Sequence, residues 1–150
     1  MGNTVIRLAF LVLIAIAPLT AAAADDGIVT RPSPYPVAET IDRLDRVLKD
    51  RKVTVFVRVD HAAEAEKASL KMPPAQLLVF GNPRAGTPLM LAAPKIALDL
   101  PMKALAWQDA GGKVWISFNS AEYLKRRHGL SDDLAKNVAV IDAIVDAALK

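Results

Sequence analysis

An acidic residue and a histidine stand side by side where a run of β-branched residues ends, at Asp60 and His61. Side chains at a strand end are exposed and imidazole titrates near neutral pH, so this pair could move a proton or contact a ligand. In that interpretation His61 is a general base, and Asp60 or Asp99 is its acidic partner. The alternative is that His61 caps the helix that follows or bonds to a loop, since spacing alone does not give proton-transfer geometry.

The turn-rich segment 80–90 is a second candidate site. The sequence predicts a short helix over 87–93, with Thr87 as its N-cap. Because a helix N-terminus offers free N–H groups, Gly86 and Thr87 could hold a carboxylate or a phosphate, and Gly81 and Asn82 in the preceding turn are further ligand-binding candidates. Backbone geometry alone would explain the same turn residues, and the segment lacks the Gly-Lys-Thr of a phosphate-binding loop.

Neither a metal centre nor a cofactor is predicted. The chain has two histidines, His61 and His128, and no cysteine. The histidines could join Asp60 or Asp99 in a metal site only if the fold brought distant segments together, and no His-x-x-x-His pair is present. No serine lies in a Gly-x-Ser-x-Gly setting, so a serine hydrolase is not indicated.

The first 24 residues have the pattern of a secretory signal peptide. Arg7 carries their one side-chain charge, an apolar stretch runs from Leu8 to Ala17, and the alanines at 21–24 supply a cleavage site. A membrane-spanning helix needs roughly 20 apolar residues, so a cleaved signal is favoured over an anchor. We expect cleavage before Asp25 and a periplasmic or secreted protein with no stable membrane anchor.

Residues 25–150 have the length of one domain. Without Arg7, the 19 basic residues become 18 against 16 acidic ones, and they are spread along the chain. Nucleic-acid binding would require a basic stripe on one face, so a nucleic-acid partner is not predicted. The absence of cysteine excludes disulfides, and the core must supply the stability.

Apolar periodicity predicts an α+β domain. Helices are expected over 36–51, 61–69, 87–93, 121–127 and 134–149, and strands over 27–31, 53–60, 76–80, 102–108 and 114–118. This order favours helices packed on one face of a largely antiparallel sheet of about five strands. The four valines of 53–59 are expected to share a face. A helix between strands 53–60 and 76–80 would allow these two to run parallel, which would bring His61 close to Asn82.

Several segments resemble the bacterial and archaeal domain of unknown function 302 (DUF302). The most distinctive block contains Phe80-Gly81-Asn82-Pro83 and Gly86-Thr87-Pro88-Leu89-Met90, and further similar segments are 35–44, 55–62, 98–101, 114–119 and 123–124. The resemblance covers nearly all of residues 25–150. It implies a TATA-binding-protein-like sheet and a homodimer, and it implies no established reaction.

Three functions remain open on these observations. The first is an exported binding module for a small ligand or a partner, with a pocket near His61 and the segment 81–87. The second is a periplasmic enzyme that uses His61 as general base, and the third is a structural or protein-interaction domain. The candidate ligand-binding residues are Asp60, His61, Gly81, Asn82, Thr87 and Asp99.

Overall fold

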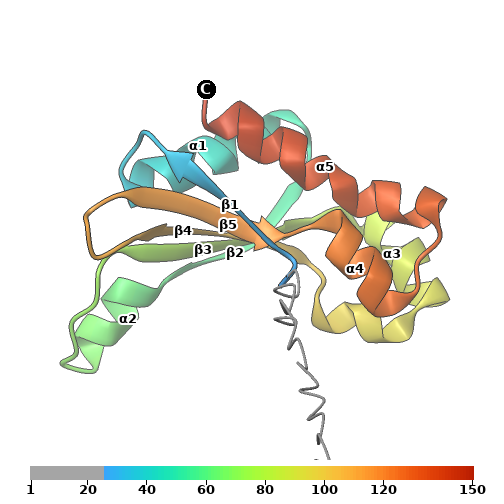
Figure 1. Ribbon diagram of the computed structural model, residues 1–150, viewed down its shortest axis with the longest axis horizontal. Coiled ribbons are helices and arrows are strands. Elements are labelled where there is room, and N and C mark those ends of the chain that lie inside the picture. Colours follow the sequence, from blue (N-terminus) through green and yellow to red (C-terminus); the bar gives the residue numbers. More distant parts are fainter. Residues whose placement is uncertain (1–25) are drawn as a thin grey trace, which may run out of the picture.

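The computed structural model describes residues 26–150, which contain a five-stranded antiparallel sheet (Figure 1). The strand order is β1-β5-β4-β3-β2. The strands are β1 (Ile28–Ser33), β2 (Thr54–Asp60), β3 (Ala75–Gly81), β4 (Met102–Gln108) and β5 (Val114–Asn119). The expected α+β class is therefore confirmed. The expected signal peptide and its cleavage before Asp25 lie outside the described residues.

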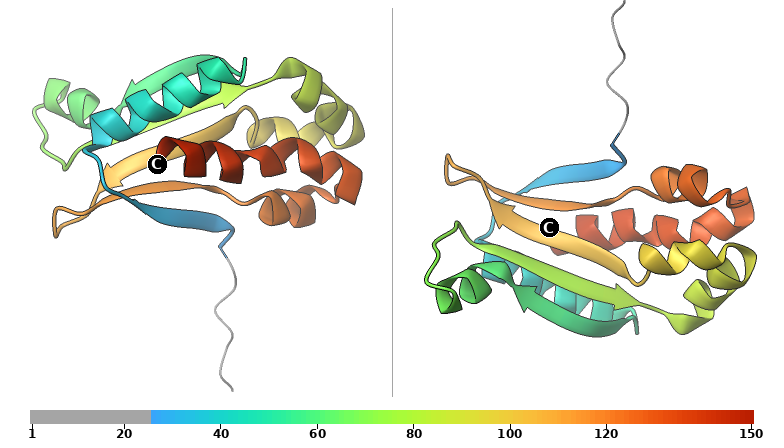
Figure 2. Two further views of the ribbon diagram at one scale, coloured as in Figure 1. Left: turned by 90° about the horizontal axis from the view of Figure 1, so that it is seen from above. Right: turned by 90° about the horizontal axis from the view of Figure 1, so that it is seen from below.

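Two long helices, α1 (Val37–Asp50) and α5 (Asp132–Ala148), lie side by side over one face of the sheet (Figure 2). Both are amphipathic, and their apolar sides meet the alternate strand residues that point toward them. The core between the layers contains Ile41, Leu44, Leu48, Leu78, Phe80, Ile116, Phe118, Ile141, Ile144 and Val145. Burying a large apolar side chain contributes about 1.5–3 kcal/mol, so this layer dominates the stability of the fold.

The shorter helices lie at the two ends of the sheet (Figure 1). Helix α2 (His61–Lys67) lies at the end where β2 finishes. At the opposite end are α3 (Pro83–Ala92), the 3-10 helix η1 (Pro94–Leu98) and α4 (Ala121–His128). A second apolar cluster joins these elements to α5 and contains Leu89, Ile96, Leu124, Leu130 and Val138. This end of the sheet is therefore packed well enough to form the walls of a site.

The expectation that His61 lies near Asn82 is wrong, because β2 and β3 run antiparallel. Asp60 at the end of β2 pairs with Gln76 at the start of β3, and Gly81 at the end of β3 pairs with Thr54 at the start of β2. The residues that follow the two strands, His61 and Asn82, therefore lie at opposite ends of the sheet. Over a strand of this length the separation is roughly 20 Å. Helix α2 belongs to the connection between β2 and the neighbouring antiparallel strand β3, and it is not a crossover between two parallel strands.

A β-bulge overturns the expectation that the four valines of β2 share a face. Val55 pairs with Phe80, and Val57 pairs with Val79, so Phe56 is the extra residue between them. One inserted residue reverses the side-chain alternation of the strand beyond it. Val55 therefore packs on the helix-covered core, whereas Val57 points to the opposite face.

Helix α3 begins four residues earlier than expected. The Asn82 side-chain oxygen accepts a hydrogen bond from the backbone N–H of Arg84, 2.9 Å away, and Pro83 is the first helical residue. Asn at the N-cap followed by Pro is a stronger start signal than Thr87-Pro88, and the later proline is accommodated inside the helix. Thr87 is thus a mid-helix residue. The anion site expected at its N–H groups has no structural basis.

Candidate ligand-binding site

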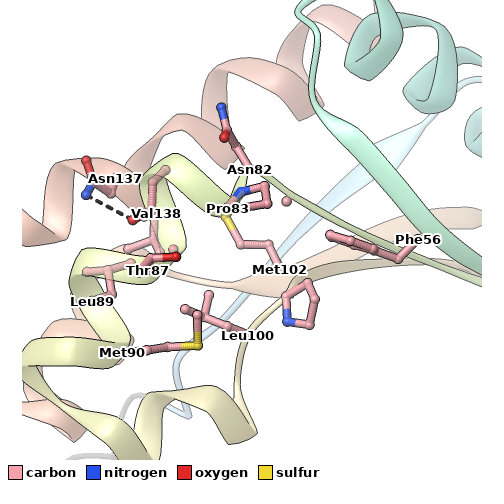
Figure 3. Close-up of a pocket in the computed structure, with 14 residues that line it drawn as sticks. Phe56, Asn82, Pro83, Thr87, Leu89, Met90, Leu100, Met102, Asn137 and Val138 are labelled. Atoms are coloured by element: carbon pink, nitrogen blue, oxygen red, sulfur yellow. Dashed lines mark hydrogen bonds between the residues drawn. The ribbon is translucent and has the colours of Figure 1, made fainter.

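A pocket of about 180 Å³ opens at the end of the sheet where β3 leads into α3 (Figure 3). Five segments form its walls: β2 with its bulge, the end of β3, helix α3, the connection from η1 into β4, and α5. The lining residues are Phe56, Gly81, Asn82, Pro83, Ala85, Gly86, Thr87, Leu89, Met90, Leu100, Pro101, Met102, Asn137 and Val138. Among these lining residues none is ionisable, so the pocket is apolar with a few amide and hydroxyl groups.

Two glycines leave space for the pocket. A Cβ atom at Gly81 would lie 3.5 Å from the Phe56 ring and 3.5 Å from Pro101. Because Gly81 has no side chain, Phe56 and Pro101 can approach each other over its backbone. A Cβ atom at Gly86 would lie 3.9 Å from both Leu100 and Met90. The interior is therefore wide because Gly86, on the pocket side of α3, contributes no side chain.

The polar groups of the pocket come from α3 and α5. The Asn137 side-chain amide donates to the Ala85 carbonyl, 3.2 Å away, which ties α5 to the first turn of α3 (Figure 3). The Asn82 side chain caps α3, and Thr87 is exposed in its middle. A ligand could form hydrogen bonds with these side chains while its apolar part occupies the interior.

The pocket wall around Leu100 is held by a charged cluster directly behind it. His128 Nε2 lies 2.6 Å from the Asp99 carboxylate, and Arg127 Nε lies 3.2 Å from the same oxygen. The side chains of His128 and Asp99 are only 6% and 15% exposed. Lys103 Nζ donates to the Asp99 and Pro101 carbonyls, at 3.0 and 3.1 Å. Asp99 therefore fixes the backbone of the wall and does not line the pocket itself.

The six candidate residues divide between the two ends of the sheet. Gly81, Asn82 and Thr87 line the pocket. Asp99 lies behind its wall. Asp60 and His61 lie at the far end, where Asp60 borders a separate, wider hollow of about 600 Å³ beside α2. Three of the six candidates thus line the pocket beside α3, whereas His61, which was expected beside them, lies at the other end of the sheet.

The contacts of Asp60 are those of a helix cap. One carboxylate oxygen accepts the Ala63 backbone N–H at 3.0 Å, and the other accepts the Gln76 side-chain amide at 2.8 Å. Arg58 Nε also bonds to the Gln76 carbonyl oxygen, at 3.0 Å. These contacts lower the pKa of Asp60, and the Ala63 N–H makes the largest contribution. Both oxygens are thus committed to residues other than His61, which is itself exposed.

Several pocket residues carried no clear signal in the sequence. Phe56 reaches the pocket because of the bulge, and nothing in a run of β-branched residues marks where a bulge falls. Met90, Leu100 and Met102 are ordinary apolar residues. Asn137 offered the one usable signal, since it is an amide between the apolar positions Leu134 and Val138 of an amphipathic helix.

A metal site is not evident in the part of the chain that the structure describes. Within residues 26–150, no group of three or more histidine, aspartate or glutamate side chains could hold a metal ion. His128 has Asp99 as its partner, whereas His61 lies at the opposite end of the sheet. Across the same range, each helix falls short of the length and hydrophobicity that crossing a bilayer requires.

The fold and the pocket together define a small α+β domain with one apolar cavity between the end of its sheet and a short helix. Residues 29–148 match the family described as "Domain of unknown function DUF302", and the chain belongs to this family. A crystal structure of an uncharacterized conserved DUF302 protein from Bacillus stearothermophilus has the same fold. Its TM-score is 0.68 at 21% identity, over 83% of this chain and 96% of that one.

Curated relatives of this chain bear the name of an ion channel. The chain is 48% identical over 120 residues to "Fluoride-specific ion channel FluC 1" of Brucella suis biovar 1 (strain 1330), which covers 79% of this chain and 47% of that protein. The identity is also 48% over 120 residues to FluC 1 of Brucella abortus biovar 1 (strain 9-941), with 44% of that protein covered. The chain therefore spans less than half the length of these relatives.

Proposed function

We propose that this DUF302 domain is an exported binding module whose ligand occupies the pocket between β3, α3 and α5. The observation that carries this proposal is the character of the pocket: about 180 Å³ of space with apolar walls and no ionisable side chain among its lining residues. An apolar concavity with a few convergent polar groups is the usual form of a small-molecule site. The periplasmic or secreted location belongs to the same proposal and depends on the pattern of residues 1–24.

The pocket favours a small, uncharged ligand. A cavity of about 150 Å³ lined by apolar side chains is large enough for benzene, so this pocket suits a molecule built around one six-membered ring or a short branched chain. A charged group would lose its hydration without gaining a counter-ion, which is strongly unfavourable. One hydroxyl or carbonyl group on the ligand would be matched by Asn82, Thr87 or Asn137.

The alternative of an enzyme with His61 as general base has less support. Asp60, the nearest carboxylate, is occupied by Ala63 and Gln76. Asp99, the other proposed partner, pairs with His128 at the opposite end of the sheet. A general base needs a positioned partner and a substrate cavity within hydrogen-bond reach. Within residues 26–150, the His61 side chain has no hydrogen-bond partner, and it is not among the residues that line the hollow beside α2.

Native mass spectrometry of the protein purified from the secreted or periplasmic fraction tests the binding module. We expect a population that carries an additional small molecule, which is released on gentle activation. The variant Gly86→Leu, which fills the pocket, should lose that molecule, and Val140→Leu on the exposed side of α5 should keep it. A small molecule retained equally by wild type and Gly86→Leu would contradict the assignment to this pocket.

A second candidate function follows from the names of the curated relatives. Because this chain matches a little less than half of proteins named as fluoride-specific ion channels, we propose that it can act together with such a channel. A strain lacking this chain should then grow more slowly in millimolar fluoride than its parent, and complementation should restore growth. Equal growth of the two strains across the fluoride range would contradict this candidate.

A further inference from the structure

The face of the sheet opposite α1 and α5 is apolar, which is unusual for a face left open. The right-hand view in Figure 2, from below, shows its strands with the two long helices behind them. An antiparallel sheet covered on one side normally carries polar residues on the other. Among the residues that the structure describes, α2 lies at one end of this face and η1, α3 and α4 at the other (Figure 1). The middle of the face has no cover.

The strand register aligns the side chains of this face in rows across the sheet. Val59, Leu77 and Leu105 form the central row with Ser117 and Thr30. Trp107 and Trp115 are directly opposite each other in the next row, with ring centroids 6.4 Å apart and 25° between the ring planes. Val57 and Val79 pair on the other side of the central row. We call these rows the open face.

Most polar groups of the open face have partners within the chain, with the Asn119 side chain, in the row of Val57 and Val79, as the exception among the described residues. The Trp107 indole N–H donates to the Ser117 hydroxyl at 2.9 Å, and Ser117 and Thr30 share a hydrogen bond of 2.8 Å. Lys103, the one charged residue of the rows, donates to carbonyls of the connection before β4. A partner could therefore cover the centre of the face, at Trp107, Ser117 and Thr30, without leaving these groups buried and unsatisfied, which would cost free energy.

We propose that the open face is the interface between two copies of this chain, stacked sheet against sheet. This proposal rests on the homodimer expected from the family resemblance and assigns that homodimer to one surface. Two identical faces related by a two-fold axis match in size and shape by symmetry. The cations of the open face are few: Lys103 is bonded to carbonyls of its own chain, and the Lys113 ammonium lies 4.1 Å from the centre of the Trp115 ring at one end of the face. So little charge disfavours a nucleic acid as the partner.

The area of the sheet sets an upper limit on the size of this interface. Five strands of six or seven residues, at a spacing of ~4.8 Å and a rise of ~3.3 Å per residue, give a face of roughly 500 Å². Stacking two copies over this whole area would bury on the order of 1,000 Å² in total, which is the size of a weak interface and fits a dimer that forms at micromolar concentration. The stacked pair of tryptophans lies within it, and tryptophan is enriched among the residues that dominate binding energy.

Sedimentation of the secreted chain and its variants tests this interface. We expect a wild-type dimer at micromolar concentration. Leu105→Glu, at the centre of the open face, should weaken the dimer at least ~100-fold and yield a monomer with an unchanged circular dichroism spectrum. The control is Val140→Glu, because Val140 is 45% exposed on α5, on the opposite side of the molecule. That variant should remain dimeric.

The possible outcomes distinguish the existence of the dimer from the assignment of its interface to the open face. A wild-type chain that stays monomeric at 100-fold higher concentration would overturn both, whereas a dimer that survives Leu105→Glu would overturn the face alone. If Leu105→Glu does not fold, Val57→Lys replaces it, since Val57 is 46% exposed on an edge strand. The chain has no cysteine, so Leu105→Cys gives an independent measurement. Oxidation should crosslink the folded dimer through Leu105→Cys and not through Val140→Cys.

Discussion

The imidazole of His128, at the end of α4, lies 2.6 Å from the carboxylate of Asp99, and both side chains are largely buried. Asp99 directly precedes Leu100 and Pro101, which form one wall of the pocket. The pair thus connects the end of a helix to the backbone of the pocket wall. We infer that the His128–Asp99 pair holds this wall of the pocket in place beside the second apolar cluster.

Removing one partner of this pair should destabilise the fold. His128→Ala leaves the Asp99 carboxylate with Arg127 alone, and a buried group that loses its hydrogen-bond partner costs about 1–3 kcal/mol. Urea denaturation of His128→Ala and Asp99→Asn measures the free energy of unfolding. His61→Ala, at the exposed histidine, is the control and should change it by less than about 0.5 kcal/mol. Equal effects of the two histidine substitutions would contradict the role of the pair.

Gly86→Ala should raise the stability of the fold and lower its affinity for a ligand. Gly86 lies inside α3, where alanine is favoured over glycine by about 0.5–1 kcal/mol, and the new methyl group would meet Leu100 and Met90 at ordinary contact distances of 3.9 Å. The variant should therefore be more stable than wild type, while its ligand affinity falls because the methyl group occupies the pocket. Thermal unfolding and ligand retention measure the two effects. A less stable variant that keeps full affinity would show that Gly86 does not face the pocket.

Asp60→Ala and His61→Ala should differ in their effect on α2. Asp60 accepts the Ala63 N–H as the N-cap of this helix, and loss of such a cap costs about 0.5–2 kcal/mol. Because none of the residues of α2 is buried, we expect the loss to be local, seen as faster amide hydrogen exchange over 63–67. His61→Ala should leave exchange there nearly unchanged. Faster exchange over 63–67 in His61→Ala than in Asp60→Ala would contradict this assignment and would indicate that His61 has a structural partner.

The β4–β5 hairpin should lose stability in acid through Asp109. Hydrogen bonds lower the pKa of Asp109, first that from the Trp115 indole and then those from the backbone N–H groups of Lys113 and Gly111. A carboxyl group whose pKa is lower in the folded state stabilises the fold above its unfolded pKa of roughly 4, and this stability is lost as the pH falls through the folded pKa. Tryptophan fluorescence during acid titration follows this loss. Asp109→Asn should reduce the acid sensitivity, and an identical acid profile for wild type and variant would contradict the assignment.

The elements of this fold could be predicted because their signals are local. The apolar spacing of Val37, Ile41, Leu44 and Leu48 gives α1, and Ser120 and Gly129 mark the start and end of α4. Ser120 accepts the Tyr123 N–H, and Gly129 has a φ of 63°, a left-handed conformation that suits glycine. The pairing of strands is not local. The direction of β3 relative to β2 depends on how the whole sheet assembles, so a parallel pair, with His61 close to Asn82, is as compatible with the sequence as the antiparallel pair that forms.

The candidate site could be predicted in part for the same reason. Gly81, Asn82 and Thr87 belong to one continuous segment, so finding the segment was enough to find three lining residues. Phe56 and Asn137 come from β2 and α5, and only the tertiary structure brings them there. Asp99 is a candidate acidic partner for His61 by its charge, yet its actual partner, His128, is 29 residues away along the chain. A pair at that separation has no signature in a single sequence.

The measurement that tests the binding module most directly is a titration of the secreted chain with benzyl alcohol, followed by amide chemical shifts in NMR. Benzyl alcohol provides one six-membered ring and one hydroxyl group, and benzoate is the matched control because it has the same ring with a negative charge. We expect saturable shifts for residues of α3, the connection 99–102 and the segment of α5 around Asn137. Benzoate should bind at least ~10-fold more weakly, and Gly86→Leu should abolish both responses. Shifts that avoid these segments, or equal binding of benzoate and benzyl alcohol, would contradict a pocket for small uncharged ligands.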